Sequence, residues 1–554
     1  MEPRKHRVGS RPRVVLAHGA WAIVVALTAG GVAAAQGTIP ADEPVWDQVT
    51  TRVSVGPGEV EGNRDSELWG NQAISGDGRF VVFSSYATNL VPGDTNRLRD
   101  IFLRDRLTGE TTRVSVSSDG QQPNGLSGNS CISADSRSVA LDSYATNLVP
   151  GDTNLASDVF IHDRVTGETT RVSTDSSGNE ANGPSARPSL SADGRFVAFK
   201  SLATNLVPGD TNNRMDVFLK DRVTGETTRV SVSSDGTEGD RGSSEDSGPA
   251  ISADGRYVAF QSAATNLVRG DSNHVDDVFV HDRVTGETTR VSVRSDGAEA
   301  NGPSWYPSLS ADGRYVAFAS VAANLIAGDM NGYLLDVFVH DRLNGQTTVV
   351  SVRSDGTQGD YESRDPAISG DGRYVTFSSG VHLAPGDGAG DDIFVHDRVT
   401  GETTCASVTY VGVVGFYFNA NIYPSISADG RYVAFSGGGP LLVPDDWNRE
   451  YDVFVRGPEI TLESEPAGVG PGQTLTLTVY KGVPGNSASL WVVRVNGART
   501  LALVAAGSFT EDGNFVLSGL VPPGLAGETI TFRGYALGHA GFQIRTNDVT
   551  VSFL

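Results

Sequence analysis

Short apolar runs separated by polar stretches recur along most of this chain. Segments such as "GRYVAF" at 255–260 and "DVFVHD" at 277–282 are nearly continuous apolar runs, which predict β-strands covered on both faces. The stretches between them are rich in Gly, Asp, Asn and Thr, as turns are. The pattern predicts an all-β chain, and the 66 glycines and three methionines among 554 residues agree with that prediction.

The same unit occurs seven times. The motif "SxDGRxVAF" and its variants begin at serines spaced by 58, 58, 61, 58, 59 and 58 residues. These serines are Ser75, Ser133, Ser191, Ser252, Ser310, Ser369 and Ser427. Each unit is expected to form four short strands, of which "PSLS", "GRYVAF", "DVFVHDR" and "TTRVSV" are examples, with the turn "DRVTGETT" joining the last two.

The two ends of the array complement each other. The seventh unit stops after "YDVFVRG" at 451–457 and lacks a "TTRVSV" segment, whereas an isolated "TTRVSV" at 50–55 precedes the first unit. Pairing this N-terminal strand with the last unit would close a ring and leave no open sheet edge. The sequence therefore predicts a seven-bladed β-propeller over residues 48–457, closed by an N-terminal strand.

The repeat resembles that of a known family. The string "PSLSADGRYVAF…DVFVHDR…TTRVSV" looks like the TolB-type, WD-like β-propeller repeat, and the match covers about residues 48–457. The resemblance implies the fold but no activity, because propellers of this type occur in binding proteins, peptidase domains and lyases. We expect no counterpart of the N-terminal domain of TolB, so its partners in the cell envelope are not carried over.

The segments outside the repeats have different compositions. Residues 1–35 resemble a secretory signal with cleavage after Ala35, since a basic stretch, an apolar stretch and "VAAAQG" follow one another. Residues 36–47 are expected to be a linker. The apolar run at 20–29 is short for a membrane span, so we expect a secreted, periplasmic or cell-surface protein with no span in the mature chain. Residues 458–554 resemble an immunoglobulin-like β-sandwich, a smaller second domain.

Charge and cysteine content narrow the function classes. The net charge of −23 disfavours nucleic acid and anionic lipid as partners. It suits an exported protein that could recruit divalent cations, but a solvated acidic surface without any cation has the same composition. The only cysteines are Cys131 and Cys405, too few for a disulfide-built scaffold. They lie three blades apart, so we expect no disulfide between them.

A repeated acidic loop is the candidate calcium site. The string "ATNLVPGDTN" at 87–96, 145–154 and 203–212 continues as "GDTNxxxDVF", which places Asp, Asn and Asp at fixed offsets in five units. The fifteen candidate ligands are Asp94, Asn96 and Asp100; Asp152, Asn154 and Asp158; Asp210, Asn212 and Asp216; Asp271, Asn273 and Asp277; and Asp446, Asn448 and Asp452. Calcium binds several such oxygens from one tight loop, but Asp and Asn also cap turns without any metal. Unit five stretches the loop to Asp329, Asn331 and Asp336, and unit six replaces it with "PGDGAGDD".

Four candidate ligand-binding residues, Trp305, Tyr306, Asp365 and Tyr423, lie where the repeats lose their symmetry. Tyr306, Asp365 and Tyr423 occupy equivalent positions where the channel is expected to open, and an aromatic pair with a carboxylate could bind sugar or peptide. Drift between the repeats would account for the same residues. No Ser/His/Asp arrangement or zinc-ligand spacing accompanies them. The sequence favours an exported, non-catalytic propeller that binds a protein or glycan, with calcium-stabilised loops on one acidic face. The alternative is a hydrolase or lyase acting on polysaccharide or peptide at the mouth of the channel.

Overall fold

The computed structural model describes residues 49–457 with short gaps, together with eight strands between 462 and 553. The gaps are residues 71, 246, 330, 381–382, 385–389, 410–421, 439–441, 445, 447 and 449. The chain divides into two compact units, one formed by Val45–Pro458 and the other containing Glu459–Leu554. The predicted signal and linker, residues 1–47, lie outside the described residues.

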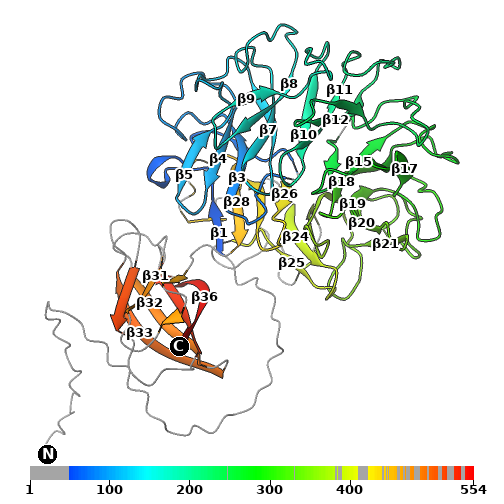
Figure 1. Ribbon diagram of the computed structural model, residues 1–554. Helices are drawn as coiled ribbons and strands as arrows, with labels where there is room; N and C mark the ends of the chain where they lie inside the picture. The colour runs from blue at the N-terminus through cyan, green and yellow to red at the C-terminus, as the bar shows by residue number, and fades with distance from the viewer. Residues whose placement is uncertain are drawn as a thin grey trace, which may run out of the picture. The chain divides into compact units, whose positions relative to one another are not determined.

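The larger unit is a seven-bladed β-propeller of four-stranded antiparallel sheets (Figure 1). Blade one has β2 (Ser66–Glu67), β3 (Phe80–Ser85), β4 (Asp100–Asp105) and β5 (Glu110–Arg113), from the channel outward. Blade two has β6 (Ser127–Ile132), β7 (Ser138–Ser143), β8 (Asp158–Asp163) and β9 (Thr169–Arg171). Blade three has β10 (Ser185–Leu190), β11 (Phe196–Ser201), β12 (Asp216–Asp221) and β13 (Thr227–Arg229). Blade four has β14 (Ala250–Ile251), β15 (Tyr257–Ser262), β16 (Asp277–Asp282) and β17 (Glu287–Arg290).

The other three blades have the same order. Blade five has β18 (Ser304–Leu309), β19 (Tyr315–Ser320), β20 (Asp336–Asp341) and β21 (Gln346–Val349). Blade six has β22 (Ser363–Ile368), β23 (Tyr374–Ser379), β24 (Asp392–Asp397) and β25 (Thr403–Cys405). Blade seven has β26 (Ile422–Ile426), β27 (Val433–Gly437), β28 (Asp452–Gly457) and, outermost, β1 (Val49–Arg52). A short 3-10 turn, η1 (Pro57–Glu59), follows β1.

The N-terminal strand closes the ring, as the sequence predicts. Strand β1 pairs antiparallel with β28, with Thr50 opposite Arg456. The Thr50 hydroxyl also donates to the Val408 carbonyl of blade six at 3.3 Å. An equivalent bond joins each other pair of neighbouring blades, as Thr227 Oγ1 to the Thr174 carbonyl at 2.6 Å illustrates. Closure therefore uses the same contacts as the rest of the ring.

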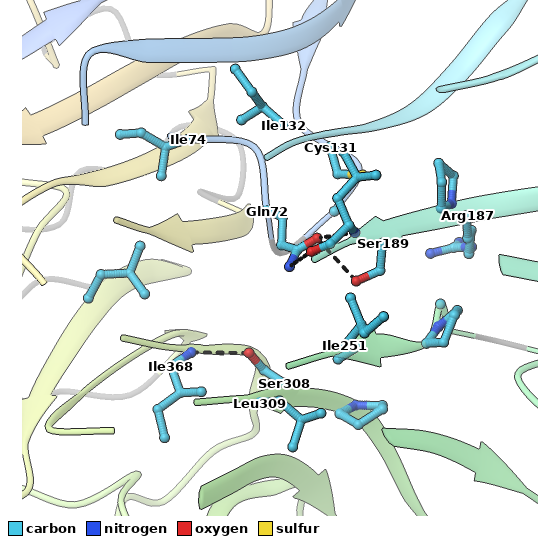
Figure 2. A pocket seen from close by; sticks show the side chains of 18 of the residues that line it. Gln72, Ile74, Cys131, Ile132, Arg187, Ser189, Ile251, Ser308, Leu309 and Ile368 are labelled. Carbon is cyan, nitrogen blue, oxygen red and sulfur yellow. Dashed lines mark hydrogen bonds between the residues drawn. The ribbon is translucent and has the colours of Figure 1, made fainter. Parts of the chain in front are cut away.

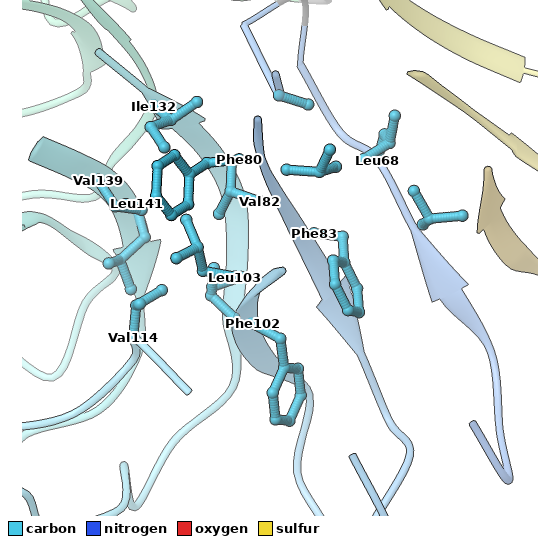
Figure 3. Close-up of a cluster of buried hydrophobic side chains, with 14 of the residues drawn as sticks. Leu68, Phe80, Val82, Phe83, Phe102, Leu103, Val114, Ile132, Val139 and Leu141 are labelled. Atoms are coloured by element: carbon cyan, nitrogen blue, oxygen red, sulfur yellow. The ribbon is translucent and has the colours of Figure 1, made fainter. Parts of the chain in front are cut away.

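The core lies between and within the blades, which explains the continuous apolar strands. Phe83 of β3 and Phe102 of β4 are fully buried, with ring centroids 5.9 Å apart (Figure 3). The same pair recurs in blades three to seven, and blade two has Leu141 opposite Phe160. Each buried aromatic ring contributes roughly 1.5–3 kcal/mol, so stability comes from many repeated contacts.

The glycine of the "DGR" turn is needed where neighbouring blades approach. Gly255 has φ +71°, a conformation that favours glycine. A Cβ at this position would lie 2.1 Å from Cδ2 of Phe196, which belongs to the preceding blade. The turn is therefore fixed by both backbone conformation and packing.

The second unit is described at the level of its strands. A three-stranded sheet has the order β29 (Leu462–Glu465), β31 (Thr474–Val479), β34 (Phe515–Leu520). A five-stranded sheet has the order β30 (Gly468–Val469), β36 (Gln543–Phe553), β35 (Thr529–Leu537), β32 (Ser487–Val495), β33 (Ala498–Ser508). The immunoglobulin-like assignment stays a prediction. Within the described part of the chain, no helix has the length and apolarity needed to cross a membrane.

Candidate functional site

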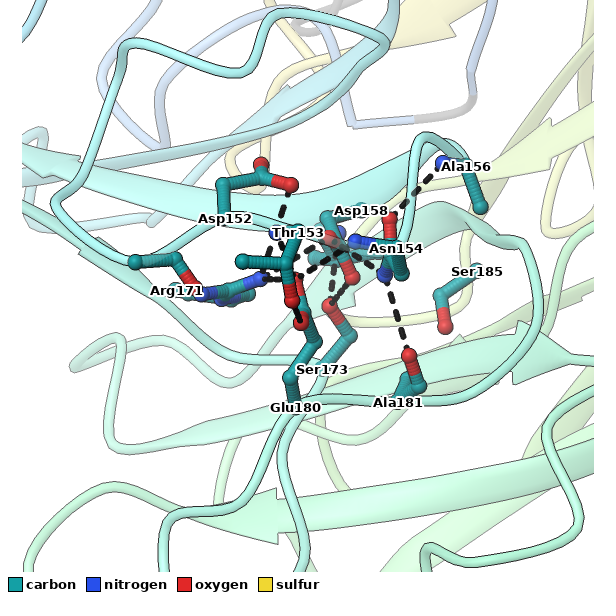
Figure 4. A network of polar contacts seen from close by, with 12 residues as sticks. Asp152, Thr153, Asn154, Ala156, Asp158, Arg171, Ser173, Glu180, Ala181 and Ser185 are labelled. Carbon is teal, nitrogen blue, oxygen red and sulfur yellow. Dashed lines mark hydrogen bonds and ion pairs between the residues drawn. The ribbon is translucent and has the colours of Figure 1, made fainter.

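In each repeated acidic loop, the asparagine fixes the turn. In blade two, Asn154 Oδ1 accepts a hydrogen bond from the Ala156 amide at 2.7 Å (Figure 4). Its Nδ2 donates to Asp158 Oδ2 and to the Ala181 carbonyl, each at 3.0 Å. The corresponding asparagines in blades one, three, four and seven make the same bonds. The asparagine thus has the turn-capping role that the sequence left open, and the carboxylates are the remaining candidate metal ligands.

An arginine lies between the two aspartates of each loop. In blade two, Arg171 Nη1 is 3.8 Å from Asp152 Oδ1 and 3.2 Å from Asp158 Oδ2. The same arrangement surrounds Arg113, Arg229, Arg290 and Arg52, with nitrogen–oxygen distances between 3.1 and 3.6 Å. The predicted aspartates therefore do come together in five blades, around a guanidinium that the spacing of the loop did not reveal.

A glutamate from the connection to the next blade completes the cluster in four blades. Glu180 pairs with Arg171 and accepts a hydrogen bond from the Thr153 amide at 2.9 Å. Glu238, Glu299 and Glu61 correspond to it, each nine residues after its arginine. Three carboxylates approach within 4.8 Å of one another in blades two, four and seven, and these acidic clusters could hold a metal ion. The constant spacing of nine residues is the sequence signal for this glutamate.

Burial and hydrogen bonding act in opposite directions on the clustered carboxyls. Burial, and then the neighbouring Asp158, raises the pKa of Asp152 to about 6. Burial also acts to raise the pKa of Glu180, but hydrogen bonds from Thr153 and Arg171 outweigh it and lower the pKa to about 2. Asp152, Asp158 and Glu180 therefore share one cationic partner, the guanidinium of Arg171.

Blade five lacks the charged partners of this cluster. Val349 stands opposite Phe338 where Arg290 stands opposite Phe279 in blade four, and Gln358 takes the place of the glutamate. Among the described residues no ion pair engages Asp336, and burial raises its pKa to about 6. In blade six Cys405 takes the arginine's position, and the loop residues 385–389 lie outside the described residues.

A second candidate site lies in the central channel, where the innermost strands bulge. The register of β10, β18, β22 and β26 shifts at Arg187, Tyr306, Asp365 and Tyr423, each of which precedes a proline. Their φ angles are 53°, 54°, 53° and 53°, unusual for residues other than glycine. All four line a cavity of about 190 Å³. The sequence placed three of them at the channel mouth and missed Arg187, which occupies the same position in its repeat.

The fourth sequence candidate, Trp305, does not line this cavity. Its indole Nε1 donates to Asp276 Oδ2 at 3.2 Å instead. The aromatic residue that sequence reasoning missed is Trp69 of blade one, which stacks on Tyr423 with ring centroids 5.3 Å apart and lines the cavity. The segment around Trp69 does not follow the repeat, so no sequence signal placed this residue.

One part of the cavity lining is aliphatic. Figure 2 labels Ile74, Ile132, Ile251, Leu309 and Ile368 among the residues that line it. The complete ring, one residue per blade, is Ile74, Ile132, Leu190, Ile251, Leu309, Ile368 and Ile426. Two positions further along each repeat, glycines and alanines are linked between blades by backbone hydrogen bonds, such as that from the Ala253 amide to the Ala311 carbonyl at 2.9 Å. These glycines and alanines also line the cavity.

One side chain joins two blades that are not neighbours. Gln72 of blade one accepts hydrogen bonds from the Leu190 amide at 2.9 Å and Ser189 Oγ at 3.1 Å, both of blade three. Its Nε2 donates to the Leu190 carbonyl at 3.2 Å. Figure 2 shows these bonds beside the aliphatic ring. Gln72 therefore satisfies backbone groups of β10 at the channel.

The charged groups at the cavity mouth come from several blades. Burial raises the pKa of Asp365 to about 6, and Arg364 and Arg187 oppose this effect. The Arg187 backbone amide donates to Asp142 Oδ2 at 3.0 Å, and Asn129 Nδ2 donates to the same oxygen at 2.7 Å. A buried carboxylate of blade two thus holds the bulge that presents Arg187.

Comparison with known proteins finds similarity among solved structures. A putative TolB from Agrobacterium tumefaciens is 12% identical and covers 66% of this chain and 98% of its own, with a TM-score of 0.33. The β-propeller domain of the Trilobed protease from Pyrococcus furiosus is 12% identical, covers 71% and 93%, and has a TM-score of 0.43. A puromycin-hydrolyzing peptidase from Mycobacterium tuberculosis is 13% identical, covers 78% and 62%, and has a TM-score of 0.41. No protein-family model and no curated protein matches the chain.

Proposed function

We propose that this chain is an exported, non-catalytic β-propeller scaffold or binding protein. In this proposal it binds a protein or glycan partner, and calcium stabilises the loops of one acidic face. The observation that carries the proposal is repetition: the same aspartate, asparagine and arginine geometry occurs in five blades. A reaction needs one distinct set of groups, whereas repeated bracing of a loop face suits a rigid binding surface.

Calcium is the proposed cation because of the oxygens that the clusters offer. In blades two, four and seven, two aspartates and a glutamate approach within 4.8 Å of one another. The buried Oδ1 atoms of Asp152, Asp271 and Asp446 accept no hydrogen bond within the described structure. Three carboxylates against one guanidinium leave negative charge for a divalent ion, which would bind beside the arginine. Asp152, Asp158 and Glu180 would hold it in blade two.

Thermal unfolding of the mature protein in calcium and in a chelator tests this part of the proposal. An ion that binds only the folded protein must raise the midpoint temperature of unfolding. We expect Glu299→Gln to reduce the gain, because it removes one of the three carboxylates of blade four. Asp296→Asn is the matched control, since Asp296 is an exposed carboxylate on the same connection. An unchanged midpoint in the wild-type protein would contradict calcium binding.

Export and the second domain are parts of the same proposal. The signal-like residues 1–35 support secretion to the periplasm, cell surface or medium, and residues 458–554 support an immunoglobulin-like accessory domain. Mass spectrometry of the secreted protein tests the first point, with an N-terminus at Gln36 as the expected result. Retention of the intact leader on a cytoplasmic protein would contradict it.

A hydrolase or lyase is the second candidate, and one observation favours it. Asp365 lines the cavity with its carboxyl buried and its pKa raised to about 6, a value suited to proton transfer near neutral pH. Turnover of polysaccharides and peptides by the wild-type protein, abolished by Asp365→Asn, would support this candidate. Turnover that survives the substitution would contradict a role for Asp365.

A further inference from the structure

We propose that the axial cavity binds the C-terminal residue of a polypeptide, with its carboxylate on Arg187 and an aliphatic side chain in the ring of seven aliphatic residues. This inference rests on the proposed binding function and names its partner as a peptide. It concerns the channel, which the repeated acidic loops do not form.

Arg187 offers a guanidinium at the mouth of the cavity. Among the described residues its side chain forms no hydrogen bond or ion pair, and only its backbone amide is bonded, although its charge opposes the rise in the pKa of Asp365. The equivalent position in blade four is Gly248, which carries no side chain, and a Cβ there would lie only 3.1 Å from Arg187 Cβ. A guanidinium fork binds a carboxylate through two parallel hydrogen bonds. Arg187 is therefore suited to an anionic group that enters from outside.

The backbone around Arg187 is held in place before any ligand binds. Asp142, which is 6% exposed, accepts a hydrogen bond from the Arg187 backbone amide and another from the Asn129 side chain. Arg187 has φ 53°, a conformation that persists only where its surroundings enforce it. These contacts fix the direction in which the arginine leaves the strand, and a fixed recognition group loses less entropy on binding.

The aliphatic ring determines which part of a ligand enters the cavity. Its seven side chains include Ile74, Ile132 and Ile251, and they form part of the lining of a cavity of about 190 Å³ (Figure 2). Pockets that enclose whole small molecules hold roughly 300–1,000 Å³, so this one suits a single side chain of a larger ligand. A sugar placed among these groups would leave hydroxyls without partners, which costs free energy. The ring therefore favours a Leu, Ile or Val side chain over a glycan.

The rest of the mouth matches a peptide backbone. Asp365, contributed by blade six, can accept a hydrogen bond from the amide of the terminal residue. The stacked pair of Trp69 and Tyr423 offers a flat aromatic surface beside it. Arg187 comes from blade three and Asp365 from blade six, and no ion pair joins them in the described structure. A peptide terminus has the carboxylate, the N–H and the apolar side chain that these three features would contact.

The test uses the full-length mature protein and an N-acetylated hexapeptide of Ala and Gly that ends in Leu. Isothermal titration compares the free acid with the C-terminal amide. We expect the free acid to bind at least about tenfold more tightly, because a charge-assisted hydrogen bond contributes more than a neutral one. Arg187→Gln should remove the difference. Arg294→Gln is the matched control, since Arg294 is an exposed arginine that pairs with Asp296 and does not line the cavity.

Two further ligands separate a peptide from other carboxylates. The free acid 4-methylpentanoate has the leucine side chain and a carboxylate but no peptide amide, and we expect it to bind more weakly than the peptide. The same hexapeptide ending in Asp-amide carries an internal carboxylate, and we expect it not to compete. Equal affinity for either ligand, or equal affinity for acid and amide, would overturn the proposal.

The results also separate this inference from the proposed function. If the wild-type protein is folded and stabilised by calcium but does not bind the peptide, the inference is overturned and the proposed function is not. Cleavage of the peptide, detected by mass spectrometry after the titration, would overturn the non-catalytic proposal. Ile251→Phe, which fills part of the aliphatic ring, should weaken the Leu-ending peptide but not one that ends in Gly; equal weakening would place the side chain elsewhere.

Discussion

Blades four and five share one arrangement at the start of their third strands. Asp277 of blade four and Asp336 of blade five are almost fully buried there. In each blade a serine hydroxyl donates to the aspartate, Ser292 at 2.5 Å and Ser351 at 2.8 Å, and accepts from the second residue of the strand at 3.1 Å. In both blades these two hydrogen bonds of the serine link the third strand to the segment that follows the fourth strand.

The two blades differ in what neutralises the buried carboxylate. Arg290 and Glu299 surround it in blade four, whereas Val349 and Gln358 stand at these positions in blade five. Burial raises the pKa of the aspartate in both blades, but only in blade four does an arginine oppose it. The difference teaches that the fold requires the aspartate and its serine, while the arginine sets the charge of the loop face.

Removal of the blade-four arginine should have the largest effect. We expect Arg290→Met to lower the free energy of unfolding by about 3 kcal/mol, because it leaves buried carboxylates without a cation. Val349→Met in blade five is the control and should change it by less than about 1 kcal/mol, since no charge is altered. Urea denaturation measures both, and similar losses in the two variants would contradict the role given to the arginine.

The pH dependence of blade five should give the next largest effect. The folded-state pKa of Asp336, about 6, lies above its ordinary value of 3.8, so folding favours the protonated carboxyl. Its stabilising contribution is complete below pH 4 and is lost as the pH rises through 6, a change on the order of 3 kcal/mol. Asp336→Asn should therefore gain stability relative to wild type between pH 4 and 7. A constant difference over this range would contradict the raised pKa.

Conversion of blade five to the blade-four arrangement should have a smaller effect. We expect Val349→Arg with Gln358→Glu to raise the free energy of unfolding at pH 7 by about 1 kcal/mol and to lower the pKa of Asp336. Gln358→Glu alone should destabilise, because it adds a carboxylate without a cation. NMR titration of Asp336 measures its pKa, and urea denaturation measures the free energy of unfolding. Stabilisation by Gln358→Glu alone would contradict the need for an arginine beside the carboxylates.

The smallest difference is expected at the shared serines. Ser292→Ala and Ser351→Ala each remove a buried hydrogen bond and should cost about 1–2 kcal/mol. The two losses should agree within about 0.5 kcal/mol if the serine has the same task in both blades. Thermal unfolding of the two variants provides the comparison, and a much larger loss in one blade would show that the arginine and the serine act together.

The fold was predictable because one signal is repeated and its ends match. Seven copies of the strand pattern, with "TTRVSV" at 50–55 supplying the strand missing after 457, specify both the blade and the closure. The pairing of aspartates inside each loop was also predictable, since these residues are close in sequence. The C-terminal sandwich has no repeat to support it and stays a prediction.

The groups missed by sequence reasoning come from separate strands. Arg171 and Glu180 reach Asp152 only because β9 pairs with β8 and the next connection folds over the loop. At the channel, Tyr306 stood out as an aromatic departure, whereas Arg187 precedes a proline in the same way but lies in an ordinary-looking repeat. Residues of different blades meet at the central channel only because the blades form a ring, and the sequence of a single repeat does not show which residues will meet there.

The pairing of β1 with β28 has a consequence for how the chain matures. It joins residues about 400 positions apart, such as Thr50 and Arg456, and contacts of such long sequence separation form slowly. During synthesis β1 cannot pair with β28 until the seventh blade has left the ribosome. We therefore expect the pairing of the two ends of the propeller to be a late step of folding. A chain truncated before residue 452 would keep an exposed strand on which other chains could aggregate.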